Sequence, residues 1–192
     1  MKFAKPEILS IPPDELRRVF GTEHVPQFTA KGECVNCNDR PEVRKIALSK
    51  GHLACLGKLS HGVYCKGKNE IHLMKDLTSD LKLSNYEYVA FQQLRYFGLA
   101  RPVHDAPGYW LLTHLGAEFS HGRLPVREWV KVLKNHLLED LMGRSEKKIY
   151  VHQVKGFPEW QLPEFEIIAG DVLRIPQVSP QAKLFDLKPQ TA

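Results

Sequence analysis

The sequence has no long apolar run, and only four of its 192 residues are cysteines. A bilayer crossing needs about 18 consecutive, mostly apolar residues, and no stretch approaches that length. The opening MKFAKPEILSIPPDEL holds no sustained apolar segment, so we expect no signal peptide, no membrane partner and a cytoplasmic protein. All four cysteines fall within residues 34–65, and in a reducing cytoplasm such clustering favours metal binding over disulfides.

Recognisable catalytic motifs are also missing. The sequence contains no HExxH, GxSxG or GxxxxGK[ST] pattern and no paired carboxylates, and its nine histidines occupy none of these motifs. We therefore expect no enzymatic activity and no small-molecule substrate. A metal-dependent nuclease of the HNH class is the weaker alternative, because His52 is its only candidate catalytic residue.

The net charge of +5 is modest but unevenly distributed. Residues 31–75 contain nine basic and four acidic residues, and the rest of the chain is balanced. Counterion release makes such a basic surface suited to a phosphate backbone. The alternative is a solvated basic face without a partner.

Residues 84–119 carry the most informative pattern. Ser84 and Glu87 form the capping-box pattern of a helix start, and Gly98 is a suitable helix stop. The apolar residues at helical spacing are Ala90, Phe91, Leu94 and Phe97. A hairpin is predicted over residues 99–112 with its turn at 105–108, and a second helix starts at Thr113. A helix, a two-stranded wing and a closing helix are typical of a winged helix-turn-helix.

Two runs carry a family resemblance. QLRYFGLARPV followed by GYWLLTHLGAEF is similar to the Leu-x3-Gly-Leu and Leu-Thr-x2-Gly signature of MarR-type winged-helix proteins. It is closer to small phage and bacterial winged-helix proteins that carry an N-terminal CxxC segment. The resemblance extends from about Cys34 to Arg123 and implies a DNA-binding fold with a role in transcription regulation. In a phage protein the location would be the host cytoplasm.

We therefore predict an α+β fold with five parts. A winged-helix domain (51–124) follows an N-terminal extension (1–30) and a zinc-knuckle or treble-clef-like segment (31–50). A small β-rich appendage (125–174) and a surface tail (175–192) complete the chain. In the appendage, the alternation of residues 129–133 predicts the first strand of a hairpin with its turn at Lys134–Asn135. A helix is the alternative for this segment, because its apolar residues also fit helical spacing.

The expected partner is double-stranded DNA. The solvent face of a recognition helix reads base edges in the major groove, where Asn and Gln pair with adenine and aromatic edges pack on thymine methyl groups. The candidates on the helix are Asn85, Tyr86, Tyr88, Gln92, Gln93 and Arg95. Arg101 and His104 are the candidates on the wing, and Lys50, Lys58, Lys66 and Lys68 are those upstream. Three tyrosines also suit a protein interface, so a winged helix that binds protein is the alternative, and a homodimer fits either function.

A structural Zn²⁺ site is predicted at Cys34, Cys37, His52 and Cys55. Two thiolates separated by two residues can bind one metal from a tight turn, and a hairpin within residues 39–49 would lead to a helix that donates His52 and Cys55. Other completions use His61 with Cys65, His24 or His72. The family resemblance carries over only Cys34 and Cys37. At the positions of His52 and Cys55 the relatives have core residues, which leaves Cys55 as a buried apolar residue and His52 as a surface residue in the alternative interpretation.

Overall fold

The chain forms an α+β fold, as the sequence predicts. The computed structural model describes residues 7–22, 25–67, 70–77, 81–138, 145–157, 166–169 and 172–174, with the backbone alone at Tyr64, Cys65 and the last two ranges. Within these residues there are four α-helices and several short antiparallel sheets. None of the helices in this part of the chain combines the length and the apolar content that a membrane crossing requires.

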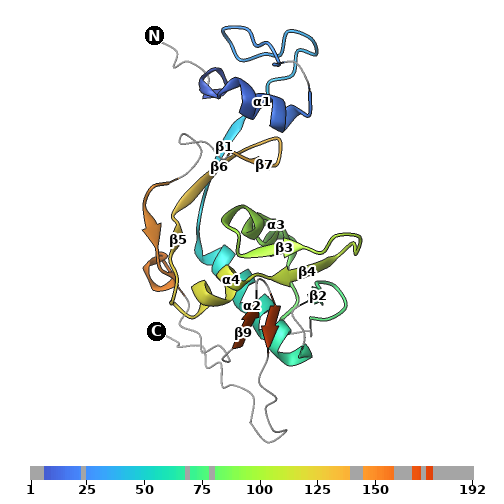
Figure 1. The fold of residues 1–192 in the computed structure, drawn as a ribbon, viewed down its shortest axis with the longest axis vertical. Coiled ribbons are helices and arrows are strands. Elements are labelled where there is room, and N and C mark those ends of the chain that lie inside the picture. Colours follow the sequence, from blue (N-terminus) through green and yellow to red (C-terminus); the bar gives the residue numbers. More distant parts are fainter. Residues whose placement is uncertain are drawn as a thin grey trace, which may run out of the picture.

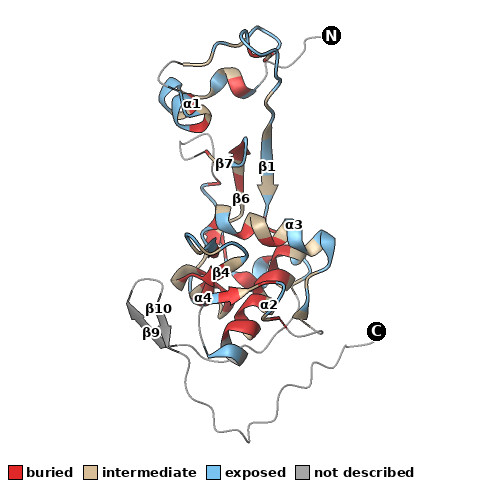
Figure 2. Ribbon diagram, turned by 90° about the vertical axis from the view of Figure 1, so that its right-hand side faces the viewer, coloured by how far each residue is buried: buried red, intermediate tan, exposed pale blue. Residues whose placement is uncertain are grey.

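The larger part of the molecule is built around helix α2 (Lys50–Lys66). Leu53, Leu56, Leu59 and Val63 recur at helical spacing and are fully buried. Burial of each such side chain stabilises the fold by about 1.5–3 kcal/mol. The elements packed around α2 are β2 (Glu70–His72), α3 (Asn85–Gln93), the 3-10 turn η3 (Leu94–Phe97), β3 (Ala100–Pro102), β4 (Tyr109–Leu112) and α4 (His114–Ser120). Figure 2 shows α2 as the buried centre of this body.

A three-stranded antiparallel sheet closes this body, in the order β2-β4-β3. β4 is the central strand: Trp110 lies opposite Ile71 of β2 on one side and Pro102 of β3 on the other. The predicted hairpin over 99–112 is therefore confirmed. The predicted start of the closing helix is also confirmed, because Thr113 caps α4 by accepting a hydrogen bond from the Gly116 N–H.

The connection between β2 and α3 contains turns over residues 73–77. The pattern of residues 74–83 is compatible with a helix or with a loop that contains one helical turn, because Thr78, Ser79 and Asp80 are suitable helix caps. Residues 73–77 agree with the loop alternative, and residues 78–80 lie outside the described part of the chain.

A narrow ribbon joins this body to a smaller N-terminal module. Strand β1 (Val43–Ala47) pairs antiparallel with β6 (Trp129–Leu133), and β6 pairs with β7 (His136–Leu137). Figure 1 shows this ribbon running from α2 to the module at the opposite end of the molecule. β6 belongs to both cores, because Val130 is buried in the main core and Leu133 in the small one.

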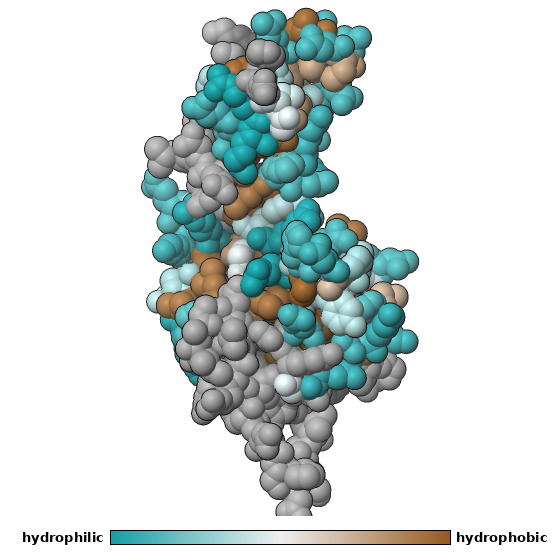
Figure 3. Space-filling model, turned by 45° about the vertical axis from the view of Figure 1, so that its right-hand side comes forward, coloured by the Kyte–Doolittle hydropathy of each residue, from teal (hydrophilic) through white to brown (hydrophobic). Residues whose placement is uncertain are grey.

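The N-terminal module contains η1 (Glu7–Ser10), α1 (Pro13–Phe20) and the loop that carries Cys34. Helix α1 is short: Gly21 ends it at φ 62°, and Leu16 and Val19 are buried against Leu133. Figure 3 shows the molecule narrowing between the mostly hydrophilic module and the body, with hydrophobic patches along the narrow part.

The ribbon corrects one prediction and confirms another. A local hairpin was expected within residues 39–49, but residues 43–47 pair instead with a strand more than 80 residues later in the chain. The hairpin of residues 129–137 is confirmed, and Lys134 and Asn135 form its turn with φ 48° and 63°. The C-terminal segment is thus part of the connection to the N-terminal module and not only an appendage.

The remaining elements are short. β5 (Val126–Arg127) pairs with β8 (Lys148–Ile149), and the 3-10 turn η5 (Val151–Gln153) follows. β9 (Glu166–Ala169) and β10 (Val172–Arg174) form a separate antiparallel pair. The tail predicted for residues 175–192 lies outside the described residues.

Candidate nucleic-acid interface

Helix α3 starts at a complete capping box. The Ser84 side chain accepts a hydrogen bond from the Glu87 N–H, and the Glu87 carboxylate accepts one from the Ser84 N–H at 2.8 Å. This satisfies two N–H groups that a helix start otherwise leaves unpaired. At the other end Gly98 adopts φ 71° and stops the 3-10 turn η3. Both predicted boundary signals are confirmed, so local signals determine where this helical stretch begins and ends.

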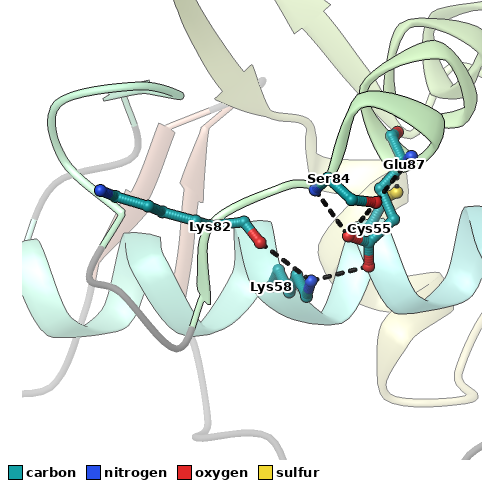
Figure 4. A network of polar contacts seen from close by, with 5 residues as sticks. All are labelled: Cys55, Lys58, Lys82, Ser84 and Glu87. Carbon is teal, nitrogen blue, oxygen red and sulfur yellow. Dashed lines mark hydrogen bonds and ion pairs between the residues drawn. The ribbon is translucent and has the colours of Figure 1, made fainter.

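An ion pair ties the start of α3 to α2. Lys58 Nζ lies 2.7 Å from Glu87 Oε1 and also donates to the Lys82 carbonyl at 3.1 Å. Figure 4 shows Lys58 reaching from α2 between these two groups. Burial raises the pKa of Glu87, but the Lys58 ammonium and the Ser84 donors outweigh burial and lower it overall. The cluster holds the first turn of α3 in a fixed position.

A second polar contact anchors the end of α3. The His52 Nδ1 accepts the Ser49 N–H at 3.2 Å, so the ring proton lies on Nε2, which donates to the Gln93 side-chain oxygen at 2.9 Å. Burial lowers the pKa of His52, and the Gln93 hydrogen bond opposes that change. His52 is therefore a buried, neutral link between α2 and α3, and not a surface histidine. Gln93, a predicted DNA contact, points into the fold.

The outward face of α3 is aromatic and polar. Tyr86 is 82% exposed, Val89 is 59% exposed, and Tyr88 and Asn85 are also exposed. Gln92 is half-buried. Asn85, Tyr86 and Val89 lie on the side of α3 away from the buried Phe91, and Tyr88 and Gln92 lie at the edge of this surface. Amide and aromatic groups of this kind can contact base edges.

Next to α3, the β3–β4 loop projects from the sheet (Figure 1). The Val103 N–H donates to the Tyr109 carbonyl, and Asp105 adopts φ 60° in the turn. His104 is almost fully exposed, and its Nδ1 lies 2.5 Å from Asp105 Oδ2. Arg101 is exposed on β3. The predicted DNA contacts Arg101 and His104 are therefore on the surface. The carboxylate of Asp105 lies beside His104 and reduces the positive charge of the β3–β4 loop.

The basic candidates fall into two groups. Arg95 is exposed and donates to the Tyr96 hydroxyl at 2.9 Å, and Lys50 and Lys66 are exposed as well. Lys58 is different, because its charge is neutralised by Glu87 inside the α2–α3 cluster. Lys68 lies outside the described residues. The predicted phosphate contact at Lys58 is thus replaced by a role in holding α3.

Sequence reasoning overlooked two surface residues. Val89 lies one helical turn after Tyr86 and enlarges the apolar part of the outward face. Lys82 is exposed two residues before the helix cap, and Figure 4 shows its side chain pointing away from the cluster. The helical spacing from Tyr86 was the sequence signal for Val89. The signal for Lys82 was its position two residues before the Ser84 cap.

The four predicted zinc ligands are not brought together. Cys34 and Cys37 lie in the loop of the N-terminal module, whereas His52 and Cys55 lie on α2 in the body. His52 is bonded to Ser49 and Gln93, and the Cys55 thiol donates to the Glu87 carbonyl at 3.2 Å. Within the described residues no three His, Cys, Asp or Glu side chains are grouped so that they could hold a metal. These four residues therefore do not form one metal site within the described chain.

Among the alternative ligands, the structure describes the side chains of His72 and His61. His72 packs edge-on against Tyr109 at 4.8 Å between ring centroids, and its Nδ1 accepts the Met74 N–H. Burial lowers the pKa of His61 on α2. His24 and the Cys65 side chain lie outside the described part of the structure.

Cys55 is expected to resist alkylation in the folded protein. Burial and the nearby Glu87 carboxylate together raise the pKa of its thiol to about 12, and the Lys58 ammonium opposes this rise. Because the thiolate is the nucleophile, three pKa units slow its reaction by about a thousandfold relative to an ordinary thiol. The measurement is iodoacetamide labelling of chelator-treated protein at about pH 8, read residue by residue by mass spectrometry, with the exposed Cys37 as the internal control. Equal labelling of Cys55 and Cys37 in folded protein would contradict the buried position.

Comparison with known proteins provides no family assignment for this geometry. The chain matches no family model, and no curated protein and no solved structure matches it either.

Proposed function

We propose that this protein binds double-stranded DNA as a winged helix-turn-helix module, with α3 in the major groove and the β3–β4 loop against the backbone. The observation that carries the proposal is the outward face of α3, held rigidly at both ends and placed beside a projecting hairpin. The order helix, strand, helix, strand, strand with the sheet order β2-β4-β3 supports it.

The polar and aromatic side chains of this surface have separate roles in the proposal. Asn85 and Gln92 pair with base edges, and Tyr86 and Tyr88 pack against thymine methyl groups. Arg95 and Lys82 contact phosphates on either side of the groove. A role in regulating transcription, in a phage or bacterial setting, is part of the same proposal and is supported by the sequence resemblance alone.

The test is fluorescence anisotropy with a mixed-sequence DNA duplex of about 30 base pairs, which spans about three helical turns. The parent protein should bind at about 50 mM salt with micromolar affinity and lose affinity steeply toward about 200 mM. The double variant Lys82→Ala with Arg95→Ala should reduce the slope of log affinity against log salt by about 2, since each phosphate contact contributes about 1.

The matched control is Lys31→Ala, which removes an exposed lysine from the N-terminal module. It should leave the salt slope unchanged. If the parent gives no anisotropy change at about 50 mM salt, or if Lys31→Ala and the double variant behave alike, the DNA proposal is wrong.

A protein partner for the same face is the second candidate. It is favoured by one observation: residues 85–93 contain no Lys or Arg, while Tyr86 and Val89 are the most exposed of the large hydrophobic side chains on the helix. Aromatic residues are enriched and lysines depleted in protein interfaces. In that case, Tyr86→Ser with Val89→Ser abolishes partner binding, and the parent gives no DNA-dependent anisotropy change.

A further inference from the structure

The segment 34–38 is a tight turn that holds two thiols together. The backbone N–H groups of Asn36 and Cys37, together with the Cys37 side chain, lower the pKa of the Cys34 thiol because they favour its thiolate. The Asn38 N–H donates to the Cys34 carbonyl at 2.9 Å, and Asn38 itself adopts φ 58°. Backbone donors aimed at one sulfur, with a second sulfur beside it, are what a pair of metal-binding thiolates requires.

Neighbouring backbone fixes this turn. Cys34 pairs with Phe28 in an antiparallel bridge, and the Val35 N–H donates to the Gln27 carbonyl at 2.9 Å. The Cys34 N–H donates to the Asp39 carbonyl at 2.7 Å. Cys34 is buried at its base, whereas Cys37 is exposed and Val35 is 53% exposed. The turn is thus preformed and opens to the surface of the module.

The turn supplies only half of the ligands of a structural zinc site. Such sites are tetrahedral and take four protein ligands. Among the described residues no third His, Cys, Asp or Glu joins the pair, and His52 and Cys55 are engaged in the body of the fold. The missing two ligands therefore come from outside this set, and the module lies at one end of the molecule, where a second copy has access (Figure 1).

We propose that Cys34 and Cys37 form half of a zinc site, which the same two cysteines of a second copy complete to a centre of four thiolates. A two-fold axis through the metal makes the contact self-complementary, as in most dimers. Val35 lies beside the thiols and provides apolar contact with its counterpart around the axis. Soft thiolates select zinc over hard cations such as magnesium. The site goes beyond DNA binding and does not depend on it.

The experiment measures metal content and mass on the full chain expressed with zinc. We expect about half an equivalent of zinc per chain and the mass of a dimer by light scattering. Removal of the metal with a chelator should yield the monomer, and cobalt substitution should give the charge-transfer band of four thiolates. Cys37→Ser should lose zinc and be monomeric with an unchanged circular dichroism spectrum, since Cys37 is exposed. Cys55→Ala is the matched control and should retain zinc and the dimer.

Three results would overturn the proposal. The first is one zinc per chain in a monomer, with loss of the metal on His24→Ala, because it assigns the site to a single chain. The second is metal-free, monomeric protein after expression with zinc. The third is a zinc-containing dimer that Cys37→Ser leaves intact. Each of these leaves the DNA test unaffected, so the two proposals fail separately.

Discussion

Replacing Gly116 with alanine is expected to destabilise the protein by about 3 kcal/mol. A Cβ at this position would lie 2.0 Å from the Leu99 carbonyl oxygen and 3.0 Å from a methyl group of Leu112. The first contact is with backbone, so no side-chain rotation relieves it. The Leu99 carbonyl also accepts the Thr113 N–H at the cap of α4, which limits its movement. Overpacking of this kind costs about 1–3 kcal/mol or more.

The measurement is thermal unfolding followed by circular dichroism. A loss of about 3 kcal/mol should lower the midpoint by roughly 6–12 °C for a chain of this size. Gly51→Ala is the matched control, because Gly51 is helical and its Cβ would lie at an ordinary 3.7 Å from Ser49 Oγ. That change should leave stability within about 1 kcal/mol of the parent, in the stabilising direction. An unchanged midpoint for Gly116→Ala would mean that α4 does not pack this closely on Leu99.

The elements that the sequence predicted well are those with local signals. The Ser84–Glu87 capping box and Gly98 bound the stretch that contains α3 and η3, and each acts through hydrogen bonds within three or four residues. The turn of the β3–β4 hairpin is specified in the same way, by residues that tolerate positive φ, such as Gly108 at 84°. Such signals can be read without knowledge of the rest of the fold.

Long-range pairing could not be predicted in this way. The β-branched and apolar residues in 43–47 favour a strand, but nothing local indicates that its partner is residues 129–133 rather than an adjacent segment. The same limit affects the candidate interface. Gln93 turns inward to bond His52, and Lys58 is neutralised by Glu87. These partners are 41 and 29 positions apart in the chain, so no local pattern indicates either contact. Helical periodicity identifies the face of a side chain but not the partner that it meets.

Replacing Phe91 with alanine is expected to cost about 3–5 kcal/mol, which is a large part of the stability of about 5–15 kcal/mol that is typical of a folded domain. Phe91 is fully buried and packs edge-on against Trp110 of β4 at 4.9 Å between ring centroids. This contact joins α3 to the sheet, so the cavity left by alanine lies under the candidate interface. Urea unfolding measures the loss; a midpoint equal to that of the parent would contradict the packing described here.

Tyr86→Ala on the same helix separates stability from binding. Because Tyr86 is 82% exposed, its removal should change stability by no more than about 0.5 kcal/mol. If α3 reads DNA, the same change should weaken duplex binding by about 1–3 kcal/mol, since aromatic stacking and base-edge contacts have that magnitude. Phe91→Ala, corrected for its folded fraction, should retain the outward side chains and lose less binding than Tyr86→Ala. The opposite order would mean that DNA contacts a surface other than the outward face of α3.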